Sequence, residues 1–312
     1  MESGDTDLLY DVLISGGGPA GMTAAIYAAR SGLSTLLLTG PAQGGQVAYT
    51  NVVENYPGFP VIYGTDLARK LSEHVQSAGV QTAAESAGKL ELSGAVKTIR
   101  TAEHDFSAKT VILAQGSERR KLNIPGEQEF TGRGVSYCAT CDGNFFRNRT
   151  VAVVGGGNTA VGDAIELSEL CKRVILVNRS DQLRAMEYLV ERAKEHENVE
   201  FLYGYESVEI QGSQKVEHLV LKKRSSGEQK ILDLDGVFVA IGILPNTQLL
   251  KGVLPLKDGF VEAPETCETP LPGVFAAGDL RKKELYQIVT AISDGANAAH
   301  SALLYLQNHP HE

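Results

Sequence analysis

Short apolar runs alternate along the chain with glycine-rich turns and alanine-rich segments. Residues 10–15 are mostly apolar, a glycine-rich turn follows, and residues 22–30 are rich in alanine and compatible with a helix. A second apolar run covers residues 33–38, so the order is strand, turn, helix, strand. Strands joined through a helix usually pair in parallel. The pattern predicts a βαβ unit near the N-terminus.

The same order of elements recurs in the middle of the chain. Residues 150–154 form a β-branched run, residues 155–160 form a second glycine-rich turn, and residues 161–170 and 173–177 suit a helix and a strand. The two turns start 139 positions apart (155 − 16). This spacing is too long for a solenoid repeat and suits two related domains.

The segments between these units have weaker periodicity. Residues 43–64 contain several Gly and Pro residues and predict a long irregular loop, which in a compact domain is usually functional. Residues 85–110 predict short strands in a meander, and residues 201–239 predict further strands with a hairpin tip near residues 222–227. We interpret this basic tip as a solvated turn.

Two breaks in the apolar pattern indicate how the domains connect. Residues 110–114 and 237–241 are apolar runs that each end at a segment containing glycine. The matched breaks predict two crossings between domains, so the second unit is inserted in the first. We therefore expect an α/β fold of two Rossmann-like, three-layer domains, with residues 1–117 and 247–312 in the outer domain and residues 118–246 in the inserted one.

Composition and charge narrow the function classes. The 312 residues are 43% hydrophobic and 21% charged, which is typical of a globular protein. The 29 Lys and Arg residues against 38 Asp and Glu give a net charge of −9. An acidic chain without an extended Lys/Arg cluster suits phosphate backbones poorly, so we expect no nucleic acid partner.

The N-terminal segment and the cysteines indicate the compartment. The N-terminal segment is acidic and has no basic region before an apolar stretch, and no apolar run approaches the roughly 20 residues that span a bilayer. Four cysteines in so long a chain suggest a reducing compartment. We expect a cytoplasmic protein that does not enter a membrane.

The first glycine-rich turn carries a dinucleotide-binding fingerprint, Gly16-x-Gly18-x-x-Gly21. Its glycines allow a tight turn, close approach of the backbone to a pyrophosphate, and close packing of helix on strand. The N–H groups and partial positive charge of the helix N-terminus attract the phosphates. The acidic ribose ligand that usually follows about 20 residues later is missing, since Thr39 and Gly40 stand there. Another group must therefore bind that ribose.

The second turn, Gly155-x-Gly157-x-x-Ala160, is the Gly/Ala variant of this fingerprint and predicts a second dinucleotide. Two nucleotide sites in one chain suggest electron transfer between cofactors. Arg179 and Arg184 follow the next predicted strand, where arginines receive the 2′-phosphate of NADP and a carboxylate would favour NAD. We expect NADPH; the alternative is that these arginines only solvate the start of a helix.

The segment Cys138-Ala139-Thr140-Cys141 predicts redox chemistry. Cys-x-x-Cys spacing suits a redox disulfide whose thiolate attacks a partner disulfide near neutral pH. A zinc site would need further ligands at suitable spacing and none follows, so we expect no metal, and an inert buried pair is the other alternative. Asp142 is adjacent and can hold the proton that thiol chemistry moves. Cys171 and Cys267 lack such a partner and are expected to be buried structural thiols.

Together these segments resemble the successive signatures of the low-molecular-weight thioredoxin reductases. The resemblance runs from end to end. Its most specific part is the cysteine segment, because the nucleotide fingerprints are common to many flavoproteins. The matching segments are residues 16–21, 44–46, 54–58, 135–143, 155–160 and 273–279.

The resemblance implies FAD in the outer domain, NADPH in the inserted domain, a homodimer, and thioredoxin or a thioredoxin-like protein as disulfide partner. It also implies that Cys141 lies against the flavin, that Cys138 attacks the partner disulfide, and that Asp142 is the acid or base. Asp279 would hydrogen-bond the flavin's sugar chain. The residues expected at FAD are Gly16, Gly18, Pro19, Ala20, Gly21, Gly45, Gln46, Asn55, Gly278, Asp279 and Gln287. The residues expected at NADPH are Gly155, Gly157, Asn158, Thr159, Ala160, Arg179 and Arg184.

Three positions depart from the family pattern. Ser180 stands where another arginine of the 2′-phosphate motif is expected. Losing one charge-assisted contact of roughly 1.5–3 kcal/mol costs about tenfold to a hundredfold in binding, so NADH is an alternative donor. Tyr286 replaces an arginine near FAD, Gln115 replaces a threonine, and the resemblance assigns neither of them a role.

Other functions stay open at this level. An enzyme with the same flavin and thiols could take electrons from ferredoxin, which the incomplete arginine motif favours and the intact second turn opposes. The reductase of a peroxidase system would usually carry an extra N-terminal thioredoxin-like module. A non-catalytic flavin-binding protein would have little reason to keep both cysteines beside Asp142.

The expected domain organisation also sets a geometric requirement. The thiol pair and the second glycine turn fall in the inserted domain, whereas the first glycine turn falls in the outer domain. Nicotinamide and disulfide both need the same isoalloxazine ring. We therefore expect the inserted domain to rotate about Gly116-Ser117 and residues 242–246.

Overall fold

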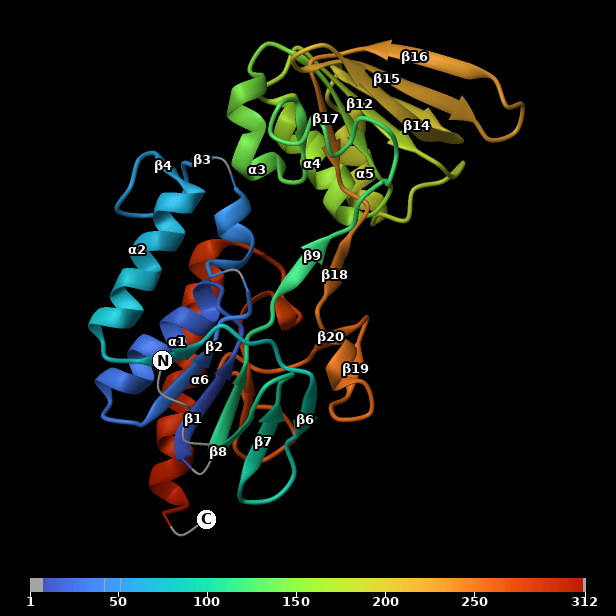
Figure 1. The fold of residues 1–312 in the computed structure, drawn as a ribbon. Helices are drawn as coiled ribbons and strands as arrows, with labels where there is room; N and C mark the ends of the chain where they lie inside the picture. The colour runs from blue at the N-terminus through green and yellow to red at the C-terminus, as the bar shows by residue number, and fades with distance from the viewer. Residues whose placement is uncertain (1–7, 42, 51, 311–312) are drawn as a thin grey trace. The chain divides into compact units, whose positions relative to one another are not determined.

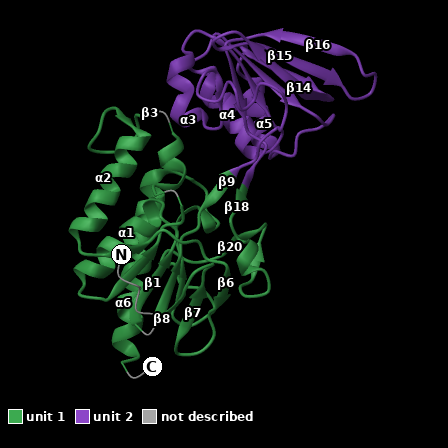
Figure 2. Cartoon of the chain, in the orientation of Figure 1, with its two compact units in different colours: residues 1–118, 244–312 green, residues 119–243 purple. Residues whose placement is uncertain are grey.

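The computed structural model describes residues 8–41, 43–50 and 52–310. Its contacts divide the chain into two compact units (Figure 2): unit 1 contains residues 1–118 and 244–312, and unit 2 contains residues 119–243. The expected boundaries differ from these by one residue (118 − 117) and by three (247 − 244). The assignment of one cofactor to each unit stays a prediction.

Unit 1 is built on one mixed sheet with the order β5-β2-β1-β8-β7-β6, and β21 also pairs with β8 (Figure 1). Pairing is parallel from β5 to β8 and for β21, whereas β6, β7 and β8 pair antiparallel. The N-terminal βαβ unit and the meander over residues 85–110 are thus confirmed. The bounds are β1 (Leu9–Ser15), β2 (Thr35–Leu38), β5 (Gln81–Ala83), β6 (Lys89–Glu91), β7 (Lys97–Arg100), β8 (Asp105–Leu113) and β21 (Val274–Ala276).

Strand β1 is buried on both faces, as a central parallel strand requires. Val12 and Ile14 pack in the cluster that contains the apolar residues of α1 (Pro19–Arg30) and α6 (Ile288–Asn308). Leu13 packs in the cluster on the opposite face. Gly295 lets α6 approach α1 closely, because a Cβ there would lie 2.2 Å from the carbonyl oxygen of Ala20.

The expectation of an irregular loop over residues 43–64 is wrong in part. This segment contains a short 3-10 helix, η1 (Gly45–Tyr49), and a hairpin of β3 (Val52–Val53) and β4 (Ile62–Tyr63), and α2 (Gly64–Ser77) begins at its end. Val47, Val53 and Ile62 form a small core of their own with residues of α2. These apolar residues are too irregularly spaced to produce a helical or strand period.

Unit 2 contains a parallel sheet with the order β10-β17-β11-β12-β13. Helices α4 (Asn158–Ser168) and α5 (Glu187–Lys194) pack on one face, and the antiparallel sheet β14-β15-β16 packs on the other. The strands expected over residues 201–239, with a hairpin tip between β15 and β16, are confirmed. The bounds are β10 (Val135–Ser136), β11 (Thr150–Val154), β12 (Arg173–Asn178), β13 (Val199–Tyr203), β14 (Tyr205–Gly212), β15 (Val216–Lys223), β16 (Gln229–Asp233) and β17 (Gly236–Val239).

The two connections between the units pair with each other as β9 (Ser117–Arg119) and β18 (Ile243–Pro245). Gly116 and Gly242 beside them have φ of +68° and +112°, which favours glycine. None of the helices described is long and apolar enough to cross a membrane. The remaining short elements are α3 (Ala139–Asp142), η2 (Gly143–Phe146), η3 (Gln248–Leu250), β19 (Leu256–Lys257), β20 (Phe260–Val261) and η4 (Gly278–Leu280).

Candidate active site

The two cysteines of the expected redox pair form a disulfide at the start of α3. Cys138 is the N-cap residue of this short helix, and Cys141 lies one turn later with its Cα 5.3 Å away. The backbone N–H of Cys141 donates a hydrogen bond to Sγ of Cys138 at 3.2 Å. Both cysteines are half-buried, so a reactant can reach them. The arrangement suits a disulfide that is opened and closed repeatedly.

Ser136 connects Asp142 to the first cysteine. The hydroxyl of this buried serine donates a hydrogen bond of 2.5 Å to Oδ2 of Asp142 and accepts one of 3.1 Å from the N–H of Cys138. The N–H of Asp142 in turn donates to the carbonyl of Cys138 at 3.1 Å. A carboxylate is therefore held beside the disulfide, as its sequence position suggested. The role of Ser136 was not predicted, because a serine in a strand has no motif of its own.

The residues around the disulfide are anchored to the rest of unit 2. The hydroxyl of Tyr137 lies 3.0 Å from the buried carboxylate of Glu127, and burial together with this negative charge raises the pKa of Tyr137 to about 12. Thr140, between the two cysteines, donates a hydrogen bond of 2.9 Å to Glu166 of α4. The cysteine segment is thus fixed from two sides.

The first glycine turn meets two other glycine-containing segments expected at FAD. The backbone of Gly45, with φ of +56°, lies so close to Gly18 that a Cβ on Gly45 would be 3.1 Å from the Cα of Gly18. Gly278, with φ of +73°, lies against Ala20 in the first turn of α1. Pro19 opens that helix, where its missing N–H leaves no bond unmade. These segments form a backbone cradle around the N-terminus of α1.

Three side chains expected at FAD form hydrogen bonds within unit 1. Gln46 donates a hydrogen bond from Nε2 to the carbonyl of Ser117. Asn55 donates to the side chain of Gln287 at 3.2 Å, and Gln287 caps the N-terminus of α6. The structure therefore brings together Asn55 and Gln287, which are 232 positions apart (287 − 55).

Asp279 has a buried charged neighbourhood that the sequence analysis missed. The carboxylate of Asp294, 4% exposed, accepts hydrogen bonds from the N–H of Gly278 (3.0 Å), from Arg281 (2.7 Å) and from Lys283 (3.1 Å). Lys283 also lies 3.5 Å from Asp279. A single acidic residue in the alanine-rich face of a helix was the available signal for this network.

Gln115 and Tyr286 are the two positions of unit 1 that depart from the family pattern. Oε1 of Gln115 is buried and has no hydrogen-bond partner among the described residues, and a Cβ on Gly16 would lie 2.9 Å from the backbone nitrogen of Gln115. A buried carbonyl without a partner beside the glycine turn is consistent with a polar ligand there. Tyr286 packs its ring 5.7 Å from that of Phe260 and accepts a hydrogen bond from the N–H of Lys283.

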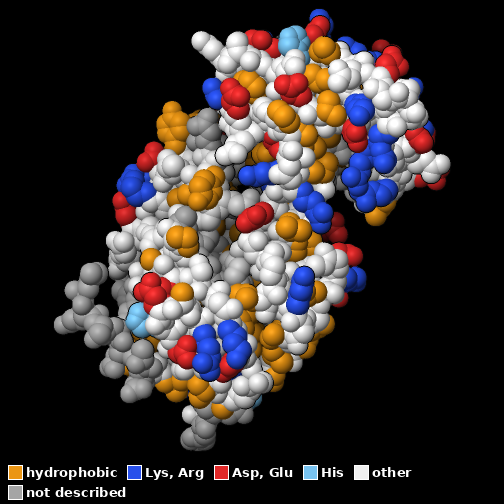
Figure 3. All heavy atoms as spheres, turned by 45° about the vertical axis from the view of Figure 1, so that its right-hand side comes forward, with side chains coloured by type: hydrophobic (Ala, Val, Ile, Leu, Met, Phe, Trp, Pro, Cys, Tyr) orange, Lys and Arg blue, Asp and Glu red, His pale blue; other side chains and the backbone are white. Residues whose placement is uncertain are grey.

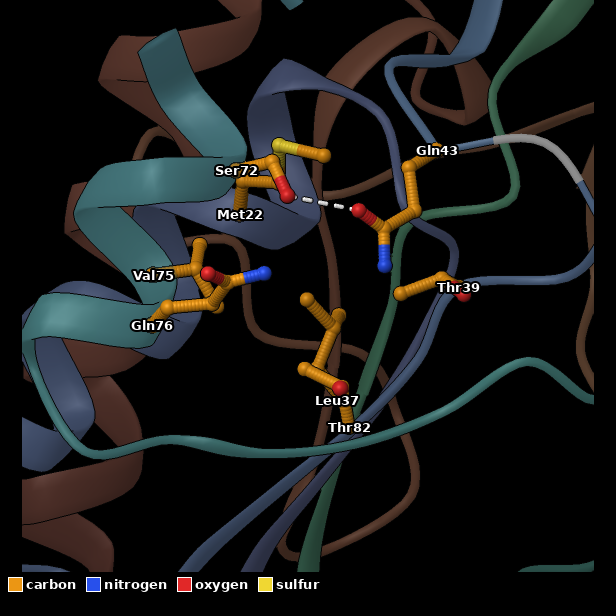
Figure 4. Close-up of a pocket in the computed structure, with 8 residues that line it drawn as sticks. All are labelled: Met22, Leu37, Thr39, Gln43, Ser72, Val75, Gln76 and Thr82. Carbon is orange, nitrogen blue, oxygen red and sulfur yellow. Dashed lines mark hydrogen bonds between the residues drawn. The ribbon is translucent and has the colours of Figure 1, made fainter. Parts of the chain in front are cut away.

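A small pocket, part of it open to solvent, lies at the carboxyl end of β2, where the usual ribose carboxylate is missing (Figure 4). Figure 4 shows Gln43 reaching toward Ser72 of α2, and their side chains form a hydrogen bond of 2.6 Å. The hydrogen-bonding groups at this end of β2 are therefore neutral amides and hydroxyls. The lining residues are Met22, Leu37, Thr39, Gln43, Ser72, Val75, Gln76 and Thr82.

The second glycine turn is tied to the segment that follows β12. The N–H of Arg184 donates a hydrogen bond of 2.7 Å to the carbonyl of Gly156, and Asn158 accepts one of 2.8 Å from the N–H of Met186. Ala160 is buried beside Gly155, and a Cβ added to that glycine would lie 2.8 Å from the Cβ of Ala160. Gly157 and Thr159 lie at the start of α4. The turn and Arg184 therefore belong to one surface of unit 2, and nucleotide binding there stays a prediction.

The other two cysteines are buried, as expected, and neither is in a disulfide. Burial, which comes first, and the charge of Asp235 raise the pKa of the Cys171 thiol to about 11. Burial and Asp294 raise that of Cys267 to about 12. Thiols that stay protonated at neutral pH are poor nucleophiles.

One group of potential metal ligands occurs among the described residues. Glu85, Glu103 and His104 place their ligand atoms within 4.8 Å of one another. His104 already pairs with Glu85 at 2.9 Å, and Thr101 donates a hydrogen bond to the same carboxylate. The group lies beside the β7–β8 turn, outside the two nucleotide surfaces and the cysteine segment.

Comparison with known proteins shows the family to which this chain belongs. The family model of the pyridine nucleotide-disulphide oxidoreductases matches residues 10–295. This chain belongs to that family. The match spans both glycine turns and the cysteine pair, so the resemblance inferred from the motifs is confirmed at the level of the family.

Members of the family that are similar to this chain over nearly its full length carry the name thioredoxin reductase. The thioredoxin reductase of Bacillus subtilis is 42% identical over 301 residues, which are 96% of this chain and 95% of that protein. A crystal structure of thioredoxin reductase from Streptococcus pyogenes is 42% identical with a TM-score of 0.91, covering 96% of this chain and 99% of that one. A structure described as a ferredoxin-flavin thioredoxin reductase from Clostridium acetobutylicum is 34% identical with a TM-score of 0.53, covering 96% and 98%.

Proposed function

We propose that this protein is a thioredoxin reductase that transfers electrons from NADPH through FAD to the Cys138–Cys141 disulfide and then to thioredoxin. The observation that carries the proposal is the Cys-x-x-Cys disulfide with Asp142 held beside it by Ser136. Relatives with the name thioredoxin reductase at about 42% identity support the same assignment. The two glycine turns supply one nucleotide-binding surface in each unit.

The residues of unit 1 fit FAD. The glycine turn and the backbones of Gly45 and Gly278 form the cradle, Gln46, Asn55, Asp279 and Gln287 supply polar side chains, and the buried Oε1 of Gln115 is a further acceptor. Neutral amides and hydroxyls at the end of β2 can hydrogen-bond a ribose in place of the missing carboxylate. When bound, FAD supplies a two-electron acceptor for hydride that can pass its electrons to a disulfide.

The thiol steps follow from the cysteine geometry. Two electrons and two protons convert the Cys138–Cys141 disulfide into two thiols. The thiolate of Cys138 then attacks one sulfur of the partner disulfide, which forms a mixed disulfide and releases the other partner sulfur as a thiol after protonation. The thiolate of Cys141 attacks Sγ of Cys138, which restores the intrachain disulfide and releases the second partner thiol. Asp142 accepts and returns the protons that these steps move.

The electron donor is the part of the proposal with a specific rival. Arg179 and Arg184 favour NADPH, whereas Ser180 in place of a third arginine leaves NADH or a ferredoxin-type donor as alternatives. The similarity to a ferredoxin-flavin thioredoxin reductase favours the ferredoxin-type donor as the second candidate. The arrangement of the second turn, with Arg184 bonded to Gly156, favours a nucleotide.

The partner and the setting follow from the family resemblance. We expect thioredoxin or a thioredoxin-like protein as disulfide substrate, a homodimer as the active form, and a cytoplasmic location. A net charge of −9 makes binding to nucleic acid unfavourable.

The decisive experiment is anaerobic stopped-flow absorbance of the purified flavoprotein, mixed separately with NADPH and NADH while the oxidised-flavin band is followed. We expect fast bleaching by NADPH, and then reduction of thioredoxin by the reduced enzyme, measured through insulin turbidity. Equal or faster bleaching by NADH would reverse the cofactor assignment. No bleaching by either nucleotide, with reduction by ferredoxin instead, would replace the donor. Bleaching without reduction of any thioredoxin would contradict the substrate.

A further inference from the structure

The end of β12, where Ser180 replaces the expected arginine, is joined to the basic hairpin tip between β15 and β16. The N–H of Arg224 at this tip donates a hydrogen bond of 2.8 Å to the carbonyl of Gly204, and the N–H of Gly204 donates one of 3.3 Å to the carbonyl of Ser180. Two backbone hydrogen bonds, both made by Gly204, thus link the hairpin tip to Ser180, the position where the arginine is missing.

The side chain of Arg224 turns toward the same segment. Its Nη1 donates a hydrogen bond of 3.4 Å to the carbonyl of Arg179. This bond is long and its acceptor is neutral, so the guanidinium keeps most of its donor capacity for another group. Arg224, Arg179 and Ser180 are all exposed, so a ligand can reach them.

The backbone around Ser180 is held in one shape. The carboxamide of Asn178, a buried residue, donates hydrogen bonds of 2.9 Å to the carbonyls of both Ser180 and Gln182. Arg184 follows and is bonded through its N–H to Gly156 of the glycine turn. Arginines from two separate stretches of the chain, Arg179 and Arg184 after β12 and Arg224 at the hairpin tip, therefore flank one turn.

The charge balance of this surface calls for an anion. None of the three arginines forms a salt bridge with any residue in the described ranges. Asp181 is one nearby negative charge, with Oδ1 3.1 Å from where a Cβ on Gly204 would lie. Figure 3 shows Lys and Arg side chains gathered on one part of unit 2. Residues 179–184 and 222–228 together carry five basic side chains and two acidic ones, Asp181 and Glu228, which leaves a local excess of positive charge that a phosphate would neutralise.

We propose that Arg224 binds the 2′-phosphate of NADPH and supplies the positive charge that Ser180 does not. The inference rests on the proposed function, because it deepens the assignment of the second glycine turn to a nicotinamide nucleotide. It replaces the interpretation of the hairpin tip as only a solvated turn. Arg224 is 40 positions further along the chain than Arg184 (224 − 184), so a motif that spans the end of β12 cannot include it.

The test is calorimetric titration of the oxidised holoenzyme with NADP⁺ and, separately, with NAD⁺, so that the readout does not depend on turnover. Arg224→Gln should weaken NADP⁺ binding by about tenfold to a hundredfold, as the loss of one charge-assisted contact predicts, and leave NAD⁺ binding within about twofold. Arg224→Lys should retain part of the NADP⁺ affinity. The dependence of NADP⁺ binding on salt should become shallower in Arg224→Gln, because one cation fewer faces the phosphate.

Lys230→Gln is the matched control, because it removes one positive charge from the same hairpin at a position opposite Leu221 in the strand pair instead of at the tip. It should bind NADP⁺ as the unchanged protein does. Equal weakening by Lys230→Gln would show a general charge effect and overturn the inference. Unchanged NADP⁺ binding in Arg224→Gln, with clear weakening in Arg184→Gln, would overturn the role of Arg224 and leave the NADPH assignment intact. If the unchanged protein does not prefer NADP⁺ to NAD⁺, both the inference and the NADPH assignment fail.

Discussion

Ser136 shows how one small side chain can organise a reactive group. Its hydroxyl joins the carboxylate of Asp142 to the backbone of Cys138, so this carboxylate is held beside the disulfide. A hydrogen bond to a carboxylate favours its ionised form. Ser136 is therefore expected to tune the proton transfer of thiol exchange without touching the nucleotide surfaces.

Ser136→Ala should lower kcat for thioredoxin reduction by about tenfold and move the acidic limb of its pH profile upward, because Asp142 loses a hydrogen bond that favours its charged form. The rate of flavin bleaching by NADPH should not change. Stopped-flow and steady-state assays across pH separate the two rates. Thr140→Ala, which removes the bond to Glu166 instead, serves as control. A slowing of both rates in Ser136→Ala would show general damage to unit 2 instead of a role in thiol exchange.

Asp163 of α4 is a carboxyl group whose ionisation lowers the free energy of unfolding. Burial, and after it the charge of Glu166, raise the pKa of this carboxyl to about 7 from 3.8, although Arg119 opposes the shift. Because the folded pKa lies above the usual value, the folded protein binds this proton more tightly than the unfolded chain. The resulting stability is complete below about pH 4 and is lost as pH rises to about 7.

Asp163→Asn should therefore raise the free energy of unfolding at about pH 8, by at most about 4 kcal/mol, and make little difference near pH 4. Urea denaturation at the two pH values measures this. If the variant and the unchanged protein differ in free energy of unfolding by the same amount at both pH values, the Asp163 carboxyl does not titrate between them. Glu197→Gln, at an exposed position of the same unit without an ion pair among the described residues, should show no such pH dependence.

At the scale of elements, the contact between α1 and α6 depends on Gly295. A Cβ there would lie 2.2 Å from the carbonyl of Ala20 and 3.1 Å from the backbone nitrogen of Ala24. Backbone atoms cannot move aside as a flexible side chain can. The two helices therefore approach each other over a surface where only a hydrogen atom fits, beside the cradle formed by Gly278 and the first turn of α1.

Gly295→Ala should destabilise unit 1 by about 1–3 kcal/mol, as overpacking does, and weaken retention of the flavin. Gly162→Ala is the matched control: it is also inside a helix, α4, but nothing lies within 4 Å of the added Cβ. There the gain in helix propensity should stabilise the protein by about 1 kcal/mol. Thermal unfolding followed by flavin fluorescence distinguishes the two. A loss of stability in both variants would contradict the packing argument.

Elements with a strong period could be predicted from the sequence, and contacts between distant segments could not. The βαβ units, the meander and the hairpin follow from alternating apolar runs and glycine turns. The apolar residues of the small core around Val47 and η1 follow no period, so the sequence predicts only an irregular loop over residues 43–64. The buried network of Asp294 and Lys283, and the approach of Arg224 to Arg179, depend on residues that meet only in three dimensions.

At the scale of the whole molecule, the chain crosses between its units twice, at β9 and β18. The cysteine pair and the second glycine turn belong to unit 2, whereas the first glycine turn and the cradle belong to unit 1. If the proposed cofactors bind there, a disulfide and a nicotinamide carried by one unit must each react with a flavin carried by the other. Gly116 and Gly242 beside the crossings have conformations that favour glycine, so hinge residues are available.

If the units change position between the two half-reactions, solvent friction should limit turnover. We expect kcat for thioredoxin reduction to fall in proportion to relative viscosity in sucrose, by about two- to threefold when the viscosity rises by the same factor, because motions of whole domains displace solvent. Glycerol at matched viscosity should give the same result, and a polymer that raises only the macroscopic viscosity should not. Reduction of the flavin by dithionite, which needs no particular arrangement of the units, should keep its rate. A kcat that does not respond to sucrose would mean that chemistry limits turnover or that one arrangement of the units serves both reactions.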